Sequence, residues 1–104
     1  MNRHIFTSRI DWNDLTLEIA WEPAWLSRAV LGDAPVGHLQ VTSIAPARAP
    51  LPVSETGYRS LFIDPARVIA EGGPLNFVRA WLDHEAATPS WRAQVDAARQ
   101  GVLL

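Results

Sequence analysis

The chain has 104 residues, of which 48% are hydrophobic and 19% charged, and its formal net charge is −2 at pH 7. This balance excludes a disordered tail, and the length is that of one domain with a single core. Cysteine is absent, which excludes disulfides, thiolate nucleophiles and cysteine-ligated metal sites. No apolar run reaches the roughly 18 residues of a membrane span and no signal peptide opens the chain. We therefore expect a cytoplasmic protein without a membrane contact.

The basic residues are all arginines, nine in number, and they are spread along the chain among eleven acids. A nucleic-acid-binding surface needs basic side chains gathered on one face. We therefore expect no direct contact with nucleic acid. The absence of lysine also excludes Schiff-base chemistry.

The N-terminal part is predicted to form a three-stranded antiparallel meander over residues 1–44. Apolar side chains stand at every second position of residues 15–22, which is the period of a half-buried strand. Residues 4–10 alternate less regularly, and the turn-forming cluster at 11–14 joins the two runs into an expected hairpin. Residues 37–44 form the third run.

The segment between the second and third runs permits two interpretations. Pro23 opens a helix that continues to Leu31, or residues 22–36 form a wide loop. We expect one irregular helical turn over residues 24–28, with Trp25 covering the open edge or face of the sheet.

Residues 45–60 are rich in proline, with Pro46, Pro50 and Pro52 close together. Proline disfavours helix and suits an extended path, and Gly57 permits the positive φ of a turn. An ordered connector between the two halves is expected, and a flexible linker of similar composition is the alternative.

Residues 61–100 carry the start and stop signals of helices. Asp64-Pro65 and Thr88-Pro89 each place a capping side chain before a proline, and Gly72-Gly73 separates a first helix from a second that begins at Pro74. The second helix carries an apolar stripe. We expect an α+β fold in one domain, residues 1–104, in which the meander packs against two to three C-terminal helices.

One stretch of the chain resembles a known family. The residues are Leu51-Pro52, Glu55-Thr56-Gly57-Tyr58-Arg59-Ser60, Phe62, Gly72-Gly73-Pro74 and Ala80-Trp81-Leu82-Asp83. They are similar to a pattern, LPxxETGYRSxF followed by GGPxxFVxAWLD, in an uncharacterised family of small bacterial proteins, mainly alphaproteobacterial, from plasmids and other mobile elements. This chain has Leu61 where a histidine is expected from that family. The resemblance implies an accessory role such as modulation of host defence, plasmid maintenance or transfer, and it implies no catalytic residue.

The densest group of chemically versatile side chains is Glu55, Tyr58 and Arg59. Tyr58 and Arg59 are suited to binding an anion or a partner's carboxylate, with Glu55 as a base or an orienting group. The structural alternative pairs Arg59 with Glu55 across Gly57 while Tyr58 packs its ring. The three histidines lack metal-ligand spacing, so we expect no metal, no cofactor and no catalytic residue.

Tryptophan occurs five times, and three of these residues, Trp12, Trp25 and Trp91, fall at the ends of predicted elements. Exposed aromatic rings beside arginine, as in Trp91-Arg92, are typical of energetically dominant residues in protein interfaces. We expect at least one of the three rings to be exposed. The predicted partner-binding residues are Glu55, Tyr58, Arg59, Trp25, Trp91 and Arg92.

These observations favour a non-catalytic protein-interaction domain from a mobile element, with modulation or inhibition of a host defence system as its specific role. The partner is then a protein, and a second copy of the chain is one candidate. A small enzyme that uses Glu55, Tyr58 and Arg59 and a nucleic-acid-binding accessory protein are the alternatives.

Overall fold

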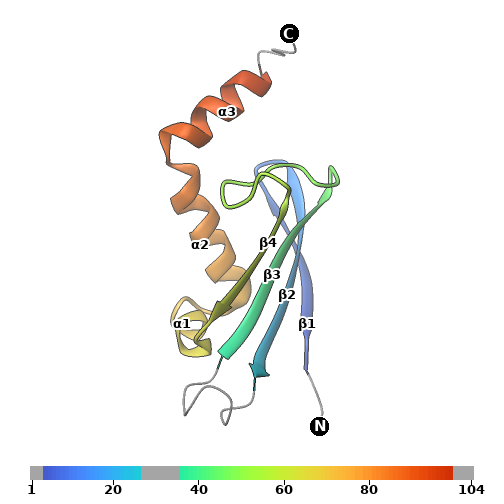
Figure 1. Ribbon diagram of the computed structural model, residues 1–104, viewed down its shortest axis with the longest axis vertical. Coiled ribbons are helices and arrows are strands. Elements are labelled where there is room, and N and C mark those ends of the chain that lie inside the picture. Colours follow the sequence, from blue (N-terminus) through green and yellow to red (C-terminus); the bar gives the residue numbers. More distant parts are fainter. Residues whose placement is uncertain (1–3, 27–35, 100–104) are drawn as a thin grey trace.

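The computed structural model describes residues 4–26 and 36–99, without the side chains of residues 25, 26, 98 and 99. Four strands precede three helices, which makes the fold α+β (Figure 1). The strands are β1 (Phe6–Trp12), β2 (Leu15–Leu26), β3 (Val36–Ala45) and β4 (Tyr58–Ile63), and the helices are α1 (Pro65–Ala70), α2 (Pro74–Ala86) and α3 (Pro89–Arg99).

The sheet is an antiparallel meander in the order β1-β2-β3-β4. The expected hairpin is confirmed, with Trp12 opposite Leu15 and a two-residue turn between them. The turn residues Asn13 and Asp14 have φ values of 46° and 66°. Asn and Asp tolerate this conformation better than most residues, and such turns match the twist of the paired strands.

The sheet has one strand more than the predicted three, because residues 58–63 form β4 and neither a connector nor a helix. The prediction of three strands was wrong because Arg59, a charged residue, occupies a position of β4 that faces the core side. It interrupts the alternation of apolar and polar residues by which a strand is recognised. The expected helical turn is also wrong where the structure describes it. β2 continues to Leu26, and a register irregularity between Glu22 and Leu26 accommodates Pro23. Residues 27 and 28 of that turn lie outside the described residues.

The segment between β3 and β4 is held by hydrogen bonds within itself and to the end of β3. The Ser43 hydroxyl donates to the Ala49 carbonyl at 2.7 Å, and Leu51, which is buried, forms an isolated bridge with Ser54. Ser43 N also donates to the carbonyl of Gly57 at 2.8 Å. These bonds bring the chain back into the sheet at the start of β4.

The helices begin where their capping residues predict. Asp64 Oδ1 accepts from Ala66 N at 2.9 Å at the start of α1, and Gly73 precedes the proline that opens α2. Thr88 Oγ1 accepts from Trp91 N at 3.3 Å in the first turn of α3. None of the described helices has the length and apolarity that a membrane crossing requires.

The core lies between the helices and one face of the sheet, which we call the inner face. Its buried residues are Ile10, Trp12, Leu17, Ile19, Trp21, Leu39, Val41, Leu51, Ile63, Val68, Val78 and Leu82. The other face, here the open face, is not covered by any described helix. The molecule measures 53 × 23 × 23 Å, and α3 extends past the end of the sheet (Figure 1).

Candidate functional site

Neighbouring residues of β4 point to opposite faces of the sheet, and this separates Tyr58 from Arg59. Tyr58 lies opposite Thr42 and faces the open side, whereas Arg59 lies opposite Val41, a core residue. The structure therefore does not bring the Tyr58 phenol and the Arg59 guanidinium into one site.

Arg59 contacts the connector and α2. Its Nη1 donates to the Val53 carbonyl at 3.4 Å, and its guanidinium carbon lies 6.0 Å from the centre of the Trp81 ring. Within the described residues it forms no ion pair with Glu55. Arg59 therefore joins the connector to α2 and stays away from the open face.

The open face of β4 carries two exposed aromatic rings, each held by a side chain of β3. Tyr58 Oη donates to Gln40 Oε1 at 2.8 Å, and the Phe62 ring stacks on His38 with centroids 4.7 Å apart and planes 14° from parallel. Tyr58 is 46% exposed and Phe62 53% exposed. We call Tyr58, Phe62, His38 and Gln40 the aromatic platform.

The surroundings of the aromatic platform are mostly uncharged. Thr42 and Ser60 fill the positions between its members in the strand register. Farther across the sheet, Arg9 and Glu18 face each other at 3.9 Å. Glu22, which lies opposite His38, is only 4% exposed. The platform therefore offers ring faces, an amide and an imidazole without a basic surface beside them.

Glu55 lies in the tight loop before β4, apart from the aromatic platform. The Ser54 hydroxyl donates to the Tyr58 carbonyl at 2.6 Å, which fixes this loop against the start of the strand. Glu55 and Trp91 both line a cavity of about 300 Å³ between the loop and α3. The structure thus groups Glu55 with α3.

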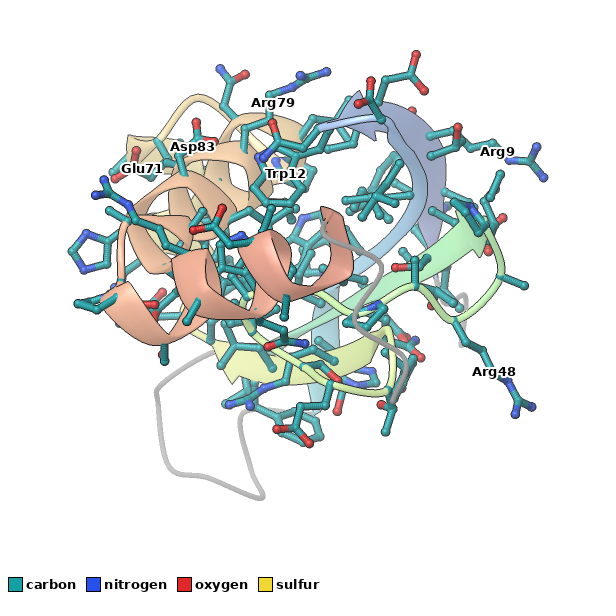
Figure 2. The ribbon with its side chains drawn as sticks, turned by 90° about the horizontal axis from the view of Figure 1, so that it is seen from above. Arg9, Trp12, Arg48, Glu71, Arg79 and Asp83 are labelled. Atoms are coloured by element: carbon teal, nitrogen blue, oxygen red, sulfur yellow. The ribbon has the colours of Figure 1, made fainter. Side chains whose placement is uncertain are left out.

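The tryptophans at element ends behave differently from one another. Trp12 is buried, with its Nε1 donating to Asp83 Oδ1 at 2.8 Å, and Figure 2 shows the two side chains next to each other. Trp91 is half-buried and packs on Trp12 at 6.4 Å between ring centroids. Arg92 is exposed. The side chain of Trp25 lies outside the described residues.

Sequence reasoning missed three members of the aromatic platform, namely His38, Gln40 and Phe62. The sequence does contain a strand pattern at this position, because Tyr58, Ser60 and Phe62 alternate with the apolar residues Leu61 and Ile63. Recognition of that strand would have placed Phe62 on the same face as Tyr58. The partner residues on β3 follow from the register, which the sequence alone does not show.

The arrangement does not assemble a catalytic or metal-binding group from the predicted residues. Tyr58, Arg59 and Glu55 lie on the open face, the inner face and a loop, respectively. Among the described residues, no three His, Asp or Glu side chains are grouped closely enough to hold a metal ion. The three predicted residues therefore lie at three separate places in the fold.

Comparison with known proteins identifies one family. A search of curated proteins and a search of solved structures found no match. The sequence model described as the KlcB third domain matches residues 5–91, which covers the whole sheet, α1 and α2 and the start of α3. The expectation of a plasmid-associated family is thereby confirmed. The chain belongs to the KlcB third-domain family, whose members are accessory proteins of plasmids.

Proposed function

We propose that this domain is a non-catalytic protein-interaction module and that the aromatic platform is the centre of its contact surface. The observation that carries the proposal is the pair of exposed rings, Tyr58 and Phe62, on a face that no described helix covers. Large aromatic side chains of this kind supply most of the binding energy in many protein interfaces.

The geometry also reduces the entropic cost of binding. The hydrogen bond from Tyr58 to Gln40 and the stacking of Phe62 on His38 restrict both rings before a partner arrives. Side chains ordered in advance lose less rotamer freedom on association. A rigid ring pair on a rigid sheet is therefore suited to a partner with a complementary apolar surface.

The charge distribution favours a protein over a nucleic acid as the partner. Affinity for nucleic acid comes mainly from arginine and lysine beside the phosphates. Arg59, the arginine nearest to Tyr58 in sequence, faces the inner side and contacts Trp81, and Arg9 is matched by Glu18. A face without a net basic charge offers little to a phosphate backbone.

The specific role that we propose is modulation or inhibition of a host defence system. The support is the plasmid setting of the family, because accessory proteins of mobile elements act in a host that resists them. In this view the aromatic platform binds a host protein and occupies a surface which that protein needs for its own activity.

The first test is binding by platform variants. A host protein captured with the tagged domain is purified, and its Kd is measured for wild type, Tyr58→Ala and Phe62→Ala. We expect each substitution to weaken binding by tenfold or more, since truncation of a central aromatic residue typically has this effect. Ile69→Ala removes another exposed apolar side chain, on α1, and serves as the matched control with unchanged affinity.

Binding that survives both platform substitutions with unchanged Kd would contradict the proposal. The defence role is tested separately by plating phage on a host with an active defence system. Expression of the wild-type domain is expected to raise the number of phage plaques, and Phe62→Ala is expected to abolish this increase. Equal plating with and without the wild-type domain would remove the defence role and leave the binding result intact.

A further inference from the structure

The strand β1 forms an outer edge of the sheet, and its outward backbone groups can be identified. A two-residue turn makes Trp12 and Leu15 a hydrogen-bonded pair, and hydrogen-bonded pairs recur at every second residue along antiparallel strands. The even-numbered residues of β1 therefore bond to β2. Thr7, Arg9 and Asp11 direct their N–H and C=O groups away from the sheet.

One outward group is already occupied. Arg79 Nη1, from α2, donates to the Asp11 carbonyl at 3.4 Å, which agrees with an outward orientation of that carbonyl. Within residues 4–26 and 36–99, no hydrogen-bond partner accompanies the outward groups of Thr7 and Arg9. Figure 1 shows β1 as the end strand of the sheet, and among the described strands only β2 pairs with it. The stretch Thr7–Arg9 is therefore an unpaired strand edge.

An apolar cavity lies against the same stretch on the inner face. It has a volume of about 530 Å³ and is lined by Phe6, Ser8, Ile19, Trp21 and residues 72–76. Phe6 is 59% exposed, so the start of β1 lacks the helix cover that its later residues have. A side chain from a strand beside β1 that points to the inner face would enter this cavity.

The charge of Arg9 indicates which side chain an added strand would place on the open face. The Arg9 side chain lies on the open face with 68% exposure, and its contact with Glu18 is long at 3.9 Å. Figure 2 shows Arg9 directed away from the body of the molecule. A carboxylate on the residue opposite Arg9 in an added strand would form a second ion pair with this guanidinium.

We propose that the edge of β1 is a strand-addition site for an extended peptide in which an acidic residue stands between two apolar ones. Backbone hydrogen bonds to Thr7 and Arg9 would supply affinity, and the cavity and Arg9 would select the side chains. β1 already accepts this pattern on its other side, where Leu17, Glu18 and Ile19 pair with it. The site goes beyond the proposed function, because it lies at the opposite edge of the sheet from the aromatic platform.

The test uses a synthetic peptide with the sequence of residues 15–20, Leu-Thr-Leu-Glu-Ile-Ala. Calorimetric titration into the full chain is expected to show saturable binding. Methylation of the glutamate backbone nitrogen removes a donor that faces β1 and should weaken binding about tenfold. Methylation of the preceding leucine nitrogen, which faces away from β1, is the matched control and should have little effect.

Substitutions in β1 of the protein test the same proposal independently of the peptide modifications. Thr7→Pro removes the outward N–H without touching the bonds to β2, because proline is tolerated where an edge residue has no sheet partner. It should weaken peptide binding about tenfold at an unchanged Tm, and Thr7→Val, which keeps the N–H, should not. Arg9→Glu should weaken binding of the peptide that contains glutamate. It should improve binding of a second peptide in which lysine replaces that glutamate.

Three results would overturn the assignment. One is no binding of the unmodified peptide up to its solubility limit. Another is equal binding of the peptide methylated at glutamate, or of Thr7→Pro. A third is a dimer in analytical ultracentrifugation that Thr7→Pro abolishes, which would assign the edge to a second copy of the chain. Phe62→Ala should leave peptide binding unchanged. A negative result for the strand-addition site is therefore distinct from a negative result for the aromatic platform.

Discussion

At the scale of single residues, Gly57 determines how the connector enters β4. Its φ is 77°, and a Cβ at this position would lie 2.7 Å from the Arg48 carbonyl carbon and 2.8 Å from the Ala49 carbonyl oxygen. A side chain here therefore meets two obstacles, an unfavourable backbone conformation and contact with rigid backbone.

We expect Gly57→Ala to lower the free energy of unfolding by about 1–3 kcal/mol, because the backbone at both contacts must shift. Urea unfolding followed by tryptophan fluorescence measures the change. An unfolding free energy equal to that of wild type would show that neither the positive φ nor the close approach at Gly57 opposes a side chain.

The residue pattern indicated one member of the aromatic platform, Tyr58, and the structure leaves its ring exposed on the open face. That Tyr58 contacts a partner stays a prediction. The pattern could not show that Arg59 belongs to the other face, because an arginine facing the core side contradicts simple alternation. Arg59 is accepted there because its side chain stays exposed to solvent while its guanidinium contacts the Trp81 ring and the Val53 carbonyl.

At the scale of elements, the helices were predictable and the last strand was not. Capping residues and prolines act within one turn, so Asp64-Pro65 and Thr88-Pro89 define helix starts from local sequence alone. β4 has six residues and depends on its pairing with β3, which is a contact between distant parts of the chain. Local sequence carries little information about such pairing.

The helix α3 is attached to the body mainly at its first turns. Trp91 packs on Trp12, and cavities of about 550 and 300 Å³ lie on either side of Trp91 and Gln94. Both cavities are open to solvent, so the side chains of α3 that line them lack packing contacts there that would otherwise hold the helix. The position of α3 therefore depends strongly on one ring.

Trp91→Ala is expected to release α3 while the sheet stays folded. Amide hydrogen exchange should show protection lost in residues 89–99 and retained in β2 and β3, because isolated helices of this length are marginal in water. Arg92→Ala, one residue along and exposed, is the control that should leave protection unchanged. Retained protection of α3 in Trp91→Ala would show that other contacts hold it.

At the scale of the whole molecule, the sheet and α2 form one core. Leu82 of α2 is fully buried in the same cluster as Leu17, Leu39 and Val41 from the strands. Neither layer can bury its apolar surface without the other. The sheet and the helix are therefore expected to unfold together.

Leu82→Ala should lower the free energy of unfolding by about 2–5 kcal/mol, which is the usual cost of such a truncation in a core. Far-UV circular dichroism and tryptophan fluorescence should report the same midpoint in wild type and variant. The exposed Ile69→Ala is the control, expected within about 0.5 kcal/mol of wild type. Separate midpoints for the two signals would show that the layers unfold independently.

The two unlike edges of the sheet have a geometric consequence. The aromatic platform spans β3 and β4, whereas the unpaired edge belongs to β1, and three strand spacings of about 14 Å in all separate β1 from β4. Ligands of moderate size can therefore occupy both positions at once without colliding. The domain would then act as an adaptor that holds two molecules at a distance set by the width of the sheet.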